Sequence, residues 1–171
     1  MANRESILRR RIKGLTWIFI IGLVVSGATA IPLQWEVDRL AGLLGVANNT
    51  SADQTSGLAH WLLKLREGLR DTDVRYPFMA YATDWLAFGH FVIAVAFIGA
   101  LRDPVRNRWL FTFGMIACAL IVPYAFVMGG LRGIPISWRL IDCSFGLVGI
   151  IPVWLCRKWA MELEGMRTGA G

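Results

Sequence analysis

Apolar residues are bunched into four long windows of the chain rather than spaced in a short repeat. The windows are residues 15–33, 85–101, 109–128 and 140–156, and each contains 17 to 20 residues. A tilted helix of this length crosses a hydrocarbon core about 30 Å thick, because an α-helix rises about 1.5 Å per residue. No segment alternates apolar and polar residues as the strands of a membrane β-barrel do. The pattern therefore predicts an all-α integral membrane protein, a four-helix bundle forming one membrane domain over residues 1–171.

Residues 34–83 separate the first two windows and contain no predicted span. Residues 34–46 are compatible with a short helix, and the small polar residues of 48–57 are typical of a loop. The apolar side of the short helix would carry Val37, Leu40, Leu43 and Leu44.

The clearest amphipathic pattern covers residues 58–70, with Ser56 as the expected N-cap. Its apolar residues recur at helical spacing and form one narrow stripe: Leu58, Trp61, Leu62, Leu65 and Leu69. His60 falls on the opposite, polar face. We predict an amphipathic helix that lies on the outer membrane surface or caps the bundle.

Composition and charge agree with a membrane class. Hydrophobic residues make up 56% of the chain, and the mean hydropathy is +0.51. Of 18 Lys and Arg residues, 11 flank the spans in short segments on one side: Arg4, Arg9, Arg10, Arg11, Lys13, Arg102, Arg106, Arg108, Arg157, Lys158 and Arg167. The positive-inside rule therefore predicts cytoplasmic termini, in a bacterial inner (plasma) membrane. The net charge of +6 then reflects a lipid bilayer as partner, not nucleic acid.

The N-terminus allows two interpretations. The basic residues 9–13, the apolar residues 15–25 and the Ala-Thr-Ala sequence at 28–30 together match a secretory signal peptide. The apolar stretch, however, continues to Leu33 and so reaches the length of a span. We favour an uncleaved first span. Cleavage would leave three helices in the same orientation.

The cysteines and histidines give little support for a metal or cofactor site. Cys118, Cys143 and Cys156 all fall within predicted spans and form no CxxC pair, so we expect packing residues and no disulfides or metal site. A bis-histidine haem would need His60 and His90 to face each other, and the expected polar position of His60 argues against it. The sequence assigns no cofactor, although a bound lipid or quinone would suit a membrane pocket.

Five ionisable residues lie inside or at the outer edge of the predicted spans: Asp84, His90, Arg132, Arg139 and Asp142. A charge at membrane depth costs about 2.5–3.5 kcal/mol on insertion scales, so each needs a partner or a purpose. The predicted topology puts all five in the extracytoplasmic half of the membrane. We therefore hypothesise that they converge in a polar ligand-binding site, in which the arginines would favour an anionic group.

Each member of this cluster also has a structural interpretation. Asp84 can cap the second span, and His90 shares a face with small residues and can bond to another helix. Arg139 and Asp142 can form an i, i+3 ion pair at the start of a stripe that continues through Gly146, Gly149 and Val153. The glycine-rich residues 129–135 can present amides to an anion or simply form a tight turn.

Four segments carry a resemblance to other proteins: TDWLAFGH at 83–90, RDPVRNRW at 102–109, FGMIAC at 113–118 and RGIPISWRLIDCSFG at 132–146. Together they resemble a group of bacterial four-span membrane proteins that has no established activity. The resemblance covers most of residues 58–160 and implies class and location without chemistry. The chain is also similar in size and span count to four-helix DoxX-type membrane proteins, a likeness of fold alone.

Three functions are compatible with these features. The favoured one is a binding or accessory protein, with an outer polar pocket for a lipid headgroup, a quinone or a small anion, or with a docking role as a homo-oligomer or a subunit of a membrane complex. The second is a membrane-embedded enzyme that uses Asp or His as acid or base and arginines as anion clamps. The third is a small transporter or proton path. The sequence contains no HExxH, GxSxG, P-loop or CxxC motif, so we favour a non-enzymatic function.

Overall fold

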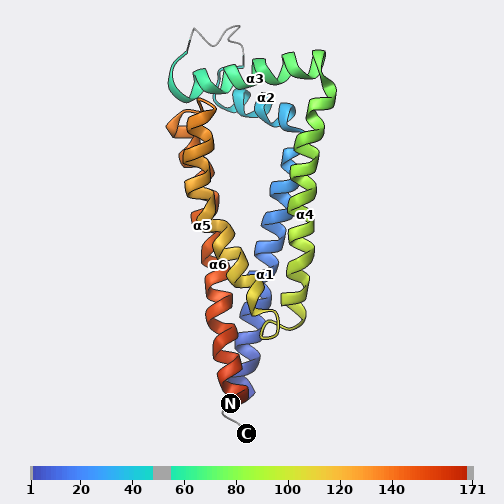
Figure 1. Cartoon of the computed structure of the whole chain (residues 1–171), viewed down its shortest axis with the longest axis vertical. Coiled ribbons are helices and arrows are strands. Elements are labelled where there is room, and N and C mark those ends of the chain that lie inside the picture. Colours follow the sequence, from blue (N-terminus) through green and yellow to red (C-terminus); the bar gives the residue numbers. More distant parts are fainter. Residues whose placement is uncertain (1, 48–54, 169–171) are drawn as a thin grey trace. The chain divides into compact units, whose positions relative to one another are not determined.

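The computed structural model describes residues 2–47 and 55–168, and every regular element among them is helical. In chain order the elements are α1 (Ala2–Ala30), α2 (Leu33–Leu43), α3 (Gly57–Arg75), the 3₁₀ turn η2 (Pro77–Ala80), α4 (Tyr81–Arg102), α5 (Arg108–Leu131) and α6 (Ile136–Thr168) (Figure 1). Residues 48–54 of the predicted loop lie outside the described residues.

Four of the described helices are long and apolar enough to cross a membrane: Asn3–Ala30, Pro77–Arg102, Arg108–Leu131 and Ile136–Thr168. Large apolar side chains are exposed in the middle of each one, as in Ile18, Val95, Leu120 and Val148. Such exposure suits a lipid environment and would be costly in water. The predicted all-α membrane protein with four spans is confirmed.

The first span differs from the prediction at both ends. Helix α1 begins at Ala2, so the basic residues 9–13 are helical, and it ends at Ala30 rather than at Leu33. Pro32 explains the early end, because a proline disfavours helical geometry in the residue before it and cannot continue the hydrogen-bond ladder. Pro32 instead stands at the N-cap of α2.

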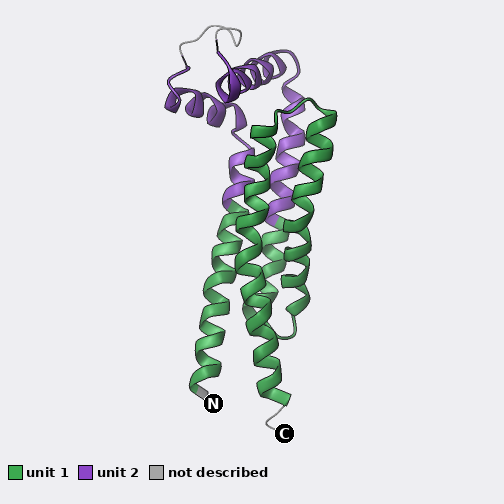
Figure 2. Ribbon diagram, turned by 90° about the vertical axis from the view of Figure 1, so that its left-hand side faces the viewer, with its two compact units in different colours: residues 1–24, 92–171 green, residues 25–91 purple. Residues whose placement is uncertain are grey.

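The chain divides into two compact units, which Figure 2 shows in different colours. Unit 1 is formed by residues 1–24 and 92–171, and unit 2 by residues 25–91. The boundary passes through α1 and α4, so each of these helices contributes to both units.

Unit 1 is built on α5 and α6, which pack side by side, together with the first part of α1 and the second part of α4. Its core consists of Leu8, Ile12, Ile20, Ala94, Phe97, Ala100, Phe111, Val153, Cys156, Ala160 and Leu163. The ring of Phe97 lies 4.8 Å from that of Phe19 and 6.3 Å from that of Phe111, centroid to centroid. The core therefore joins all four helices of this unit.

Small residues let α5 and α6 approach closely. A Cβ added to Gly146 would lie 2.5 Å from the Cys118 carbonyl oxygen, and one added to Gly149 would lie 3.1 Å from Cys118 Sγ. Gly146, Val153 and Cys156 are all buried, so the predicted α6 stripe is confirmed and runs further along the helix than expected. All three cysteines are buried and free.

Ion pairs join three segments at one end of unit 1, where α1 begins and α6 ends (Figure 2). Arg4 contacts Glu162 with a nitrogen–oxygen distance of 2.6 Å, and Arg108 pairs with Glu164. The start of α1, the start of α5 and the end of α6 therefore share this end. Arg11 also lies over the ring of Trp159, 5.8 Å from its centroid.

In unit 2, α2 packs against α3, and α3 also contacts η2. Val37, Ala41, Leu62 and Leu63 are buried. The predicted apolar side of α2 is wrong beyond Val37, because Ala41 is buried there while Leu40, Leu43 and Leu44 are exposed. Helix α3 keeps the predicted stripe but continues to Arg75, five residues past the expected end at 70. Ser56 is its N-cap residue, although its side chain makes no capping hydrogen bond.

Candidate functional site

The five ionisable residues of the predicted cluster fall into the two units. Asp84 and His90 belong to unit 2, whereas Arg132, Arg139 and Asp142 belong to unit 1. Their convergence in one site stays a prediction. Within each unit, the contacts show what each side chain does.

Asp84 is exposed in the first turn of α4 and is not its N-cap. The helix begins at Tyr81, and the turn η2 at Pro77–Ala80 leads directly into it. The predicted capping role is therefore wrong. The carboxylate still lies near the positive end of the helix dipole, where a negative charge is favourable.

His90 faces another helix, as the small residues around it predict. Its Nδ1 donates to the carbonyl oxygen of Leu86 at 2.8 Å. A Cβ on Gly27 of α1 would lie 2.9 Å from His90 Cβ and 3.0 Å from the Ala87 carbonyl oxygen. The absence of a side chain at Gly27 therefore lets α1 approach α4 closely at His90.

The backbone amides of the glycine-rich turn after α5 donate hydrogen bonds to carbonyl oxygens at the end of α5. Gly133 has a φ of +67°, its amide donates to the Gly130 carbonyl at 3.3 Å, and the Ile134 amide donates to the Gly129 carbonyl at 2.8 Å. This pair of bonds is a Schellman motif, which ends a helix by satisfying its last carbonyls. The turn interpretation accounts for these amides, so they do not point at an anion. Gly129 and Gly130, expected in the turn, are still helical.

Arg139 is engaged by this same turn. Its Nε donates to the Ile134 carbonyl oxygen at 2.6 Å, and its side chain covers Gly129, where an added Cβ would lie 2.8 Å from Arg139 Cδ. Asp142 is half-buried, and no hydrogen bond or ion pair reaches it from the described residues of unit 1. The predicted Arg139–Asp142 ion pair is therefore wrong. Arg132 is exposed at the C-cap of α5.

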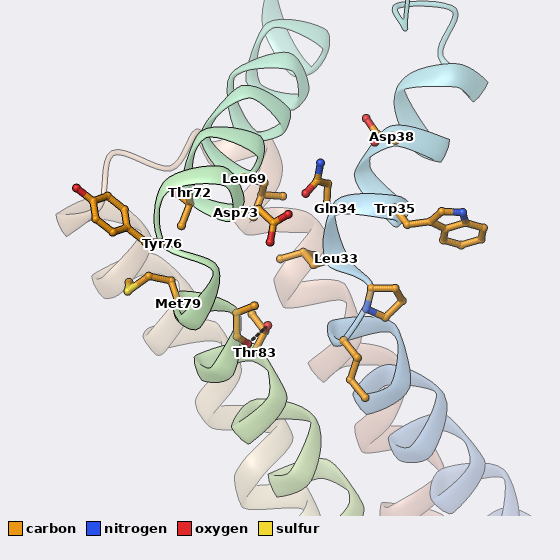
Figure 3. A pocket seen from close by; sticks show the side chains of 13 residues that line it. Leu33, Gln34, Trp35, Asp38, Leu69, Thr72, Asp73, Tyr76, Met79 and Thr83 are labelled. Carbon is orange, nitrogen blue, oxygen red and sulfur yellow. Dashed lines mark hydrogen bonds between the residues drawn. The ribbon is translucent and has the colours of Figure 1, made fainter.

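A hollow of about 610 Å³ lies within unit 2, and sequence reasoning did not predict it (Figure 3). We call it the juxtamembrane pocket. It is bounded by the α1–α2 junction, the end of α3, η2 and the start of α4. Its lining consists of Ile31, Pro32, Leu33, Gln34, Trp35, Asp38, Leu69, Thr72, Asp73, Tyr76, Met79, Ala80 and Thr83.

The lining residues of α3 follow from helical spacing. Leu69, Thr72 and Asp73 occur at i, i+3 and i+4, so they share one face of the helix, and Tyr76 follows as its C-cap residue. This face continues the apolar stripe of 58–69 with polar residues. The predicted helix end at residue 70 hid this continuation, which is the signal that could have located the pocket.

The charges in this lining are carboxylates. Asp38 pairs with Arg66 at 2.5 Å, and Arg66 also donates to the Ala47 carbonyl at 3.0 Å. Asp73 has no hydrogen bond or ion pair with the described residues of unit 2. Figure 3 shows Asp73 and Gln34 projecting from α3 and α2 into the space between them. Among residues 2–47 and 55–168, no Lys, Arg or His belongs to the lining.

Comparison with known protein families, with curated proteins and with solved structures finds no match to this chain. Among residues 2–47 and 55–168, no three His, Cys, Asp or Glu side chains gather closely enough to hold a metal ion. The site is therefore interpreted from its own geometry.

Proposed function

We propose that this chain is a small membrane-embedded binding protein and that its juxtamembrane pocket holds one amphiphile. The observation that carries the proposal is the pocket itself, an apolar-walled hollow of about 610 Å³ with a few polar groups. Pockets for small molecules have volumes of about 300–1,000 Å³ and this same mixture of apolar walls and few polar groups.

The position of the pocket supports an amphiphile rather than a water-soluble ligand. Its lining residues between positions 31 and 38 directly follow the α1 span, and those between positions 76 and 83 lie at the start of the α4 span. These segments flank the level at which two spans leave the hydrocarbon core. A ligand there could place its chain along Ile31, Leu33 and Met79 and its polar head beside Asp73.

The location of the protein is part of the same proposal. The basic residues near the start of α1, between α4 and α5, and near the end of α6 favour cytoplasmic termini under the positive-inside rule. In a bacterial inner membrane, the juxtamembrane pocket would then open at the extracytoplasmic face. Lipids and quinones are the amphiphiles available at that level.

The test is to purify the full chain in mild detergent and to identify bound lipids and quinones by mass spectrometry. In the Ala80→Trp variant, the larger side chain should fill the pocket and reduce the bound amphiphile at least about tenfold. Ala82→Trp is the matched control, because Ala82 is exposed two residues away and does not line the pocket. Equal amounts of ligand in wild type and both variants, all with normal circular dichroism, would disprove the proposal.

A further inference from the structure

We infer that the amphiphile in the juxtamembrane pocket carries an ammonium group in its head and that Asp73 contacts this group. The inference rests on the proposed function and adds the chemical class of the ligand. It is opposite in sign to the anionic ligand that the arginines of the predicted cluster would select.

The charge balance around the pocket supports a cationic head. Three arginines near the lining each have another partner in unit 2. Arg66 pairs with Asp38, and Arg75 Nε lies 3.4 Å from Asp71 Oδ1. Arg39 lies over the ring of Trp35, with its Cζ 5.0 Å from the ring centroid. Asp73 is left as the one lining carboxylate without an ion pair among the described residues of this unit.

The hydrogen-bonding capacity of the lining points the same way. The Thr72 and Thr83 hydroxyls donate to the carbonyls of Gly68 and Ala80, each at 2.7 Å, so their oxygens remain available mainly as acceptors. The Asp73 carboxylate is also an acceptor. Gln34, which also projects into the hollow, has an amide with both donors and an acceptor oxygen. A primary ammonium has three donors and no acceptor, so it can donate to Asp73 and to the oxygens of Thr72, Thr83 and Gln34. An anionic head that lacks an ammonium group would meet a like charge, and none of the described residues that line the pocket is cationic.

Apolar walls complete the match to an amphiphilic amine rather than a free cation. Leu33, Leu69 and Met79 line the same hollow as Asp73 (Figure 3). A small hydrophilic cation would leave these side chains against water. An amine attached to an acyl or alkyl chain would cover them. Two sources supply this chemistry, a membrane aminophospholipid and a free long-chain amine.

The experiment measures binding of paired probes to the full chain in mild detergent. Dodecylamine is compared with dodecanol, and phosphatidylethanolamine with its N-acetylated derivative, which lacks the ammonium charge. We expect the amine of at least one pair to bind about tenfold more tightly than its uncharged partner. The pair that shows the preference identifies the source, lipid or free amine. Equal affinity within both pairs would overturn the inference.

Variants then assign the effect to one carboxylate. Asp73→Asn should remove most of the preference for the amine and leave dodecanol binding unchanged. Asp71→Asn, with the same charge change two residues away on α3 and outside the pocket lining, should keep the preference. A preference that survives Asp73→Asn would overturn the inference.

The outcome also separates this inference from the proposed function. If Ala80→Trp removes binding of all four probes but Asp73→Asn changes none of them, the pocket stands and the ammonium assignment fails. If Ala80→Trp leaves every probe bound as in wild type, the pocket proposal itself fails.

Discussion

Arg139 and Asp142 are one helical turn apart on α6, yet in unit 1 only the arginine has a partner. Its Nε donates to Ile134, which lies in the turn just before α6. Spacing shows that two opposite charges can meet, but the backbone carbonyl at the end of the preceding turn is a competing acceptor. Here the local acceptor forms the bond, and the carboxylate is left without one.

The first prediction follows from this difference. Arg139→Met should lower the free energy of unfolding by about 1–2 kcal/mol, because the Ile134 carbonyl loses its side-chain donor. Asp142→Asn should change it by less than about 0.5 kcal/mol, since no bond in unit 1 is lost. Thermal unfolding of the two variants in detergent checks this. Equal destabilisation by both changes would instead support an ion pair.

Asp103, in the turn between α4 and α5, provides a pH-dependent contribution. Its carboxylate accepts the backbone amides of Arg106 and Val105, each at 3.1 Å, and the bond from Arg106 is the main cause that lowers the pKa of Asp103 below its ordinary value of 3.8. Because the folded-state pKa is the lower one, the ionised form stabilises the fold above the ordinary pKa. That contribution is lost as the pH falls through the folded-state pKa.

The second prediction is that Asp103→Asn lowers the unfolding temperature slightly at pH 7, by an amount equivalent to less than about 1 kcal/mol for this accessible site. The difference from wild type should shrink when the pH falls below 3.8. Melting curves recorded between pH 7 and pH 3 test it. A difference that grows toward acid pH would contradict the stated direction.

For single residues, the sequence predicted which way a side chain faces better than it predicted the group that the side chain contacts. His90 was expected to face another helix because its face carries small residues, and Gly27 now accounts for that contact. The capping role of Asp84 was wrong because the polar residue closest to a predicted span need not be its first residue. The convergence of the five charged residues depends on long-range placement, which helical spacing cannot supply.

For the helices, hydrophobic periodicity predicted which faces are used for packing, but the predicted helix ends differ from those of the structure. The stripes of α3 and α6 were predicted from spacings of three and four residues, and both are used for packing. The pocket was missed because α3 continues to Arg75 with Thr72 and Asp73 on the same face as Leu69. When polar residues follow an apolar stripe, the sequence pattern suggests that the helix has ended. The same pattern also occurs where a helix continues along the lining of a pocket.

The third prediction concerns packing between α5 and α6. Gly146→Ala should destabilise the protein by about 1–3 kcal/mol, because the new Cβ would lie 2.5 Å from the backbone oxygen of Cys118 and the helices must separate. Gly22→Ala is the control, since a Cβ there has no atom within 4 Å. Unfolding in detergent measures both. A tolerated Gly146→Ala would show that this interface is looser than described.

For the whole molecule, the number of spans fixes which exposed segments share a side of the membrane. Asn3 and Arg106 are separated by two spans, whereas Ser56 is separated from each of them by one. The ion pairs of Arg4 and Arg108 with the end of α6 are consistent with this arrangement. Because the three native cysteines are buried, single introduced cysteines can report topology with little background.

The fourth prediction is that Asn3→Cys and Arg106→Cys react with a membrane-impermeant maleimide only in inverted vesicles. Ser56→Cys should react in intact cells. This follows from the basic residues near Asn3 and Arg106, which the positive-inside rule assigns to the cytoplasm. Labelling of Asn3→Cys and Arg106→Cys from opposite sides would contradict the four-span topology. Labelling of all three with sides reversed would contradict only the orientation.

The contact between Thr16 and Cys156 also constrains how the protein is made. The two side chains are 3.7 Å apart but 140 residues apart in the chain, and Cys156 Sγ also reaches the Ile12 carbonyl. Helix α1 thus receives packing partners from α6, which is synthesised after it. Until α6 has been synthesised, Leu8, Ile12 and Ile20 lack the core residues that α6 supplies. Nascent chains that stop before residue 153 should therefore remain open to membrane proteases, and removal of the first 30 residues would leave the same gap from the other side.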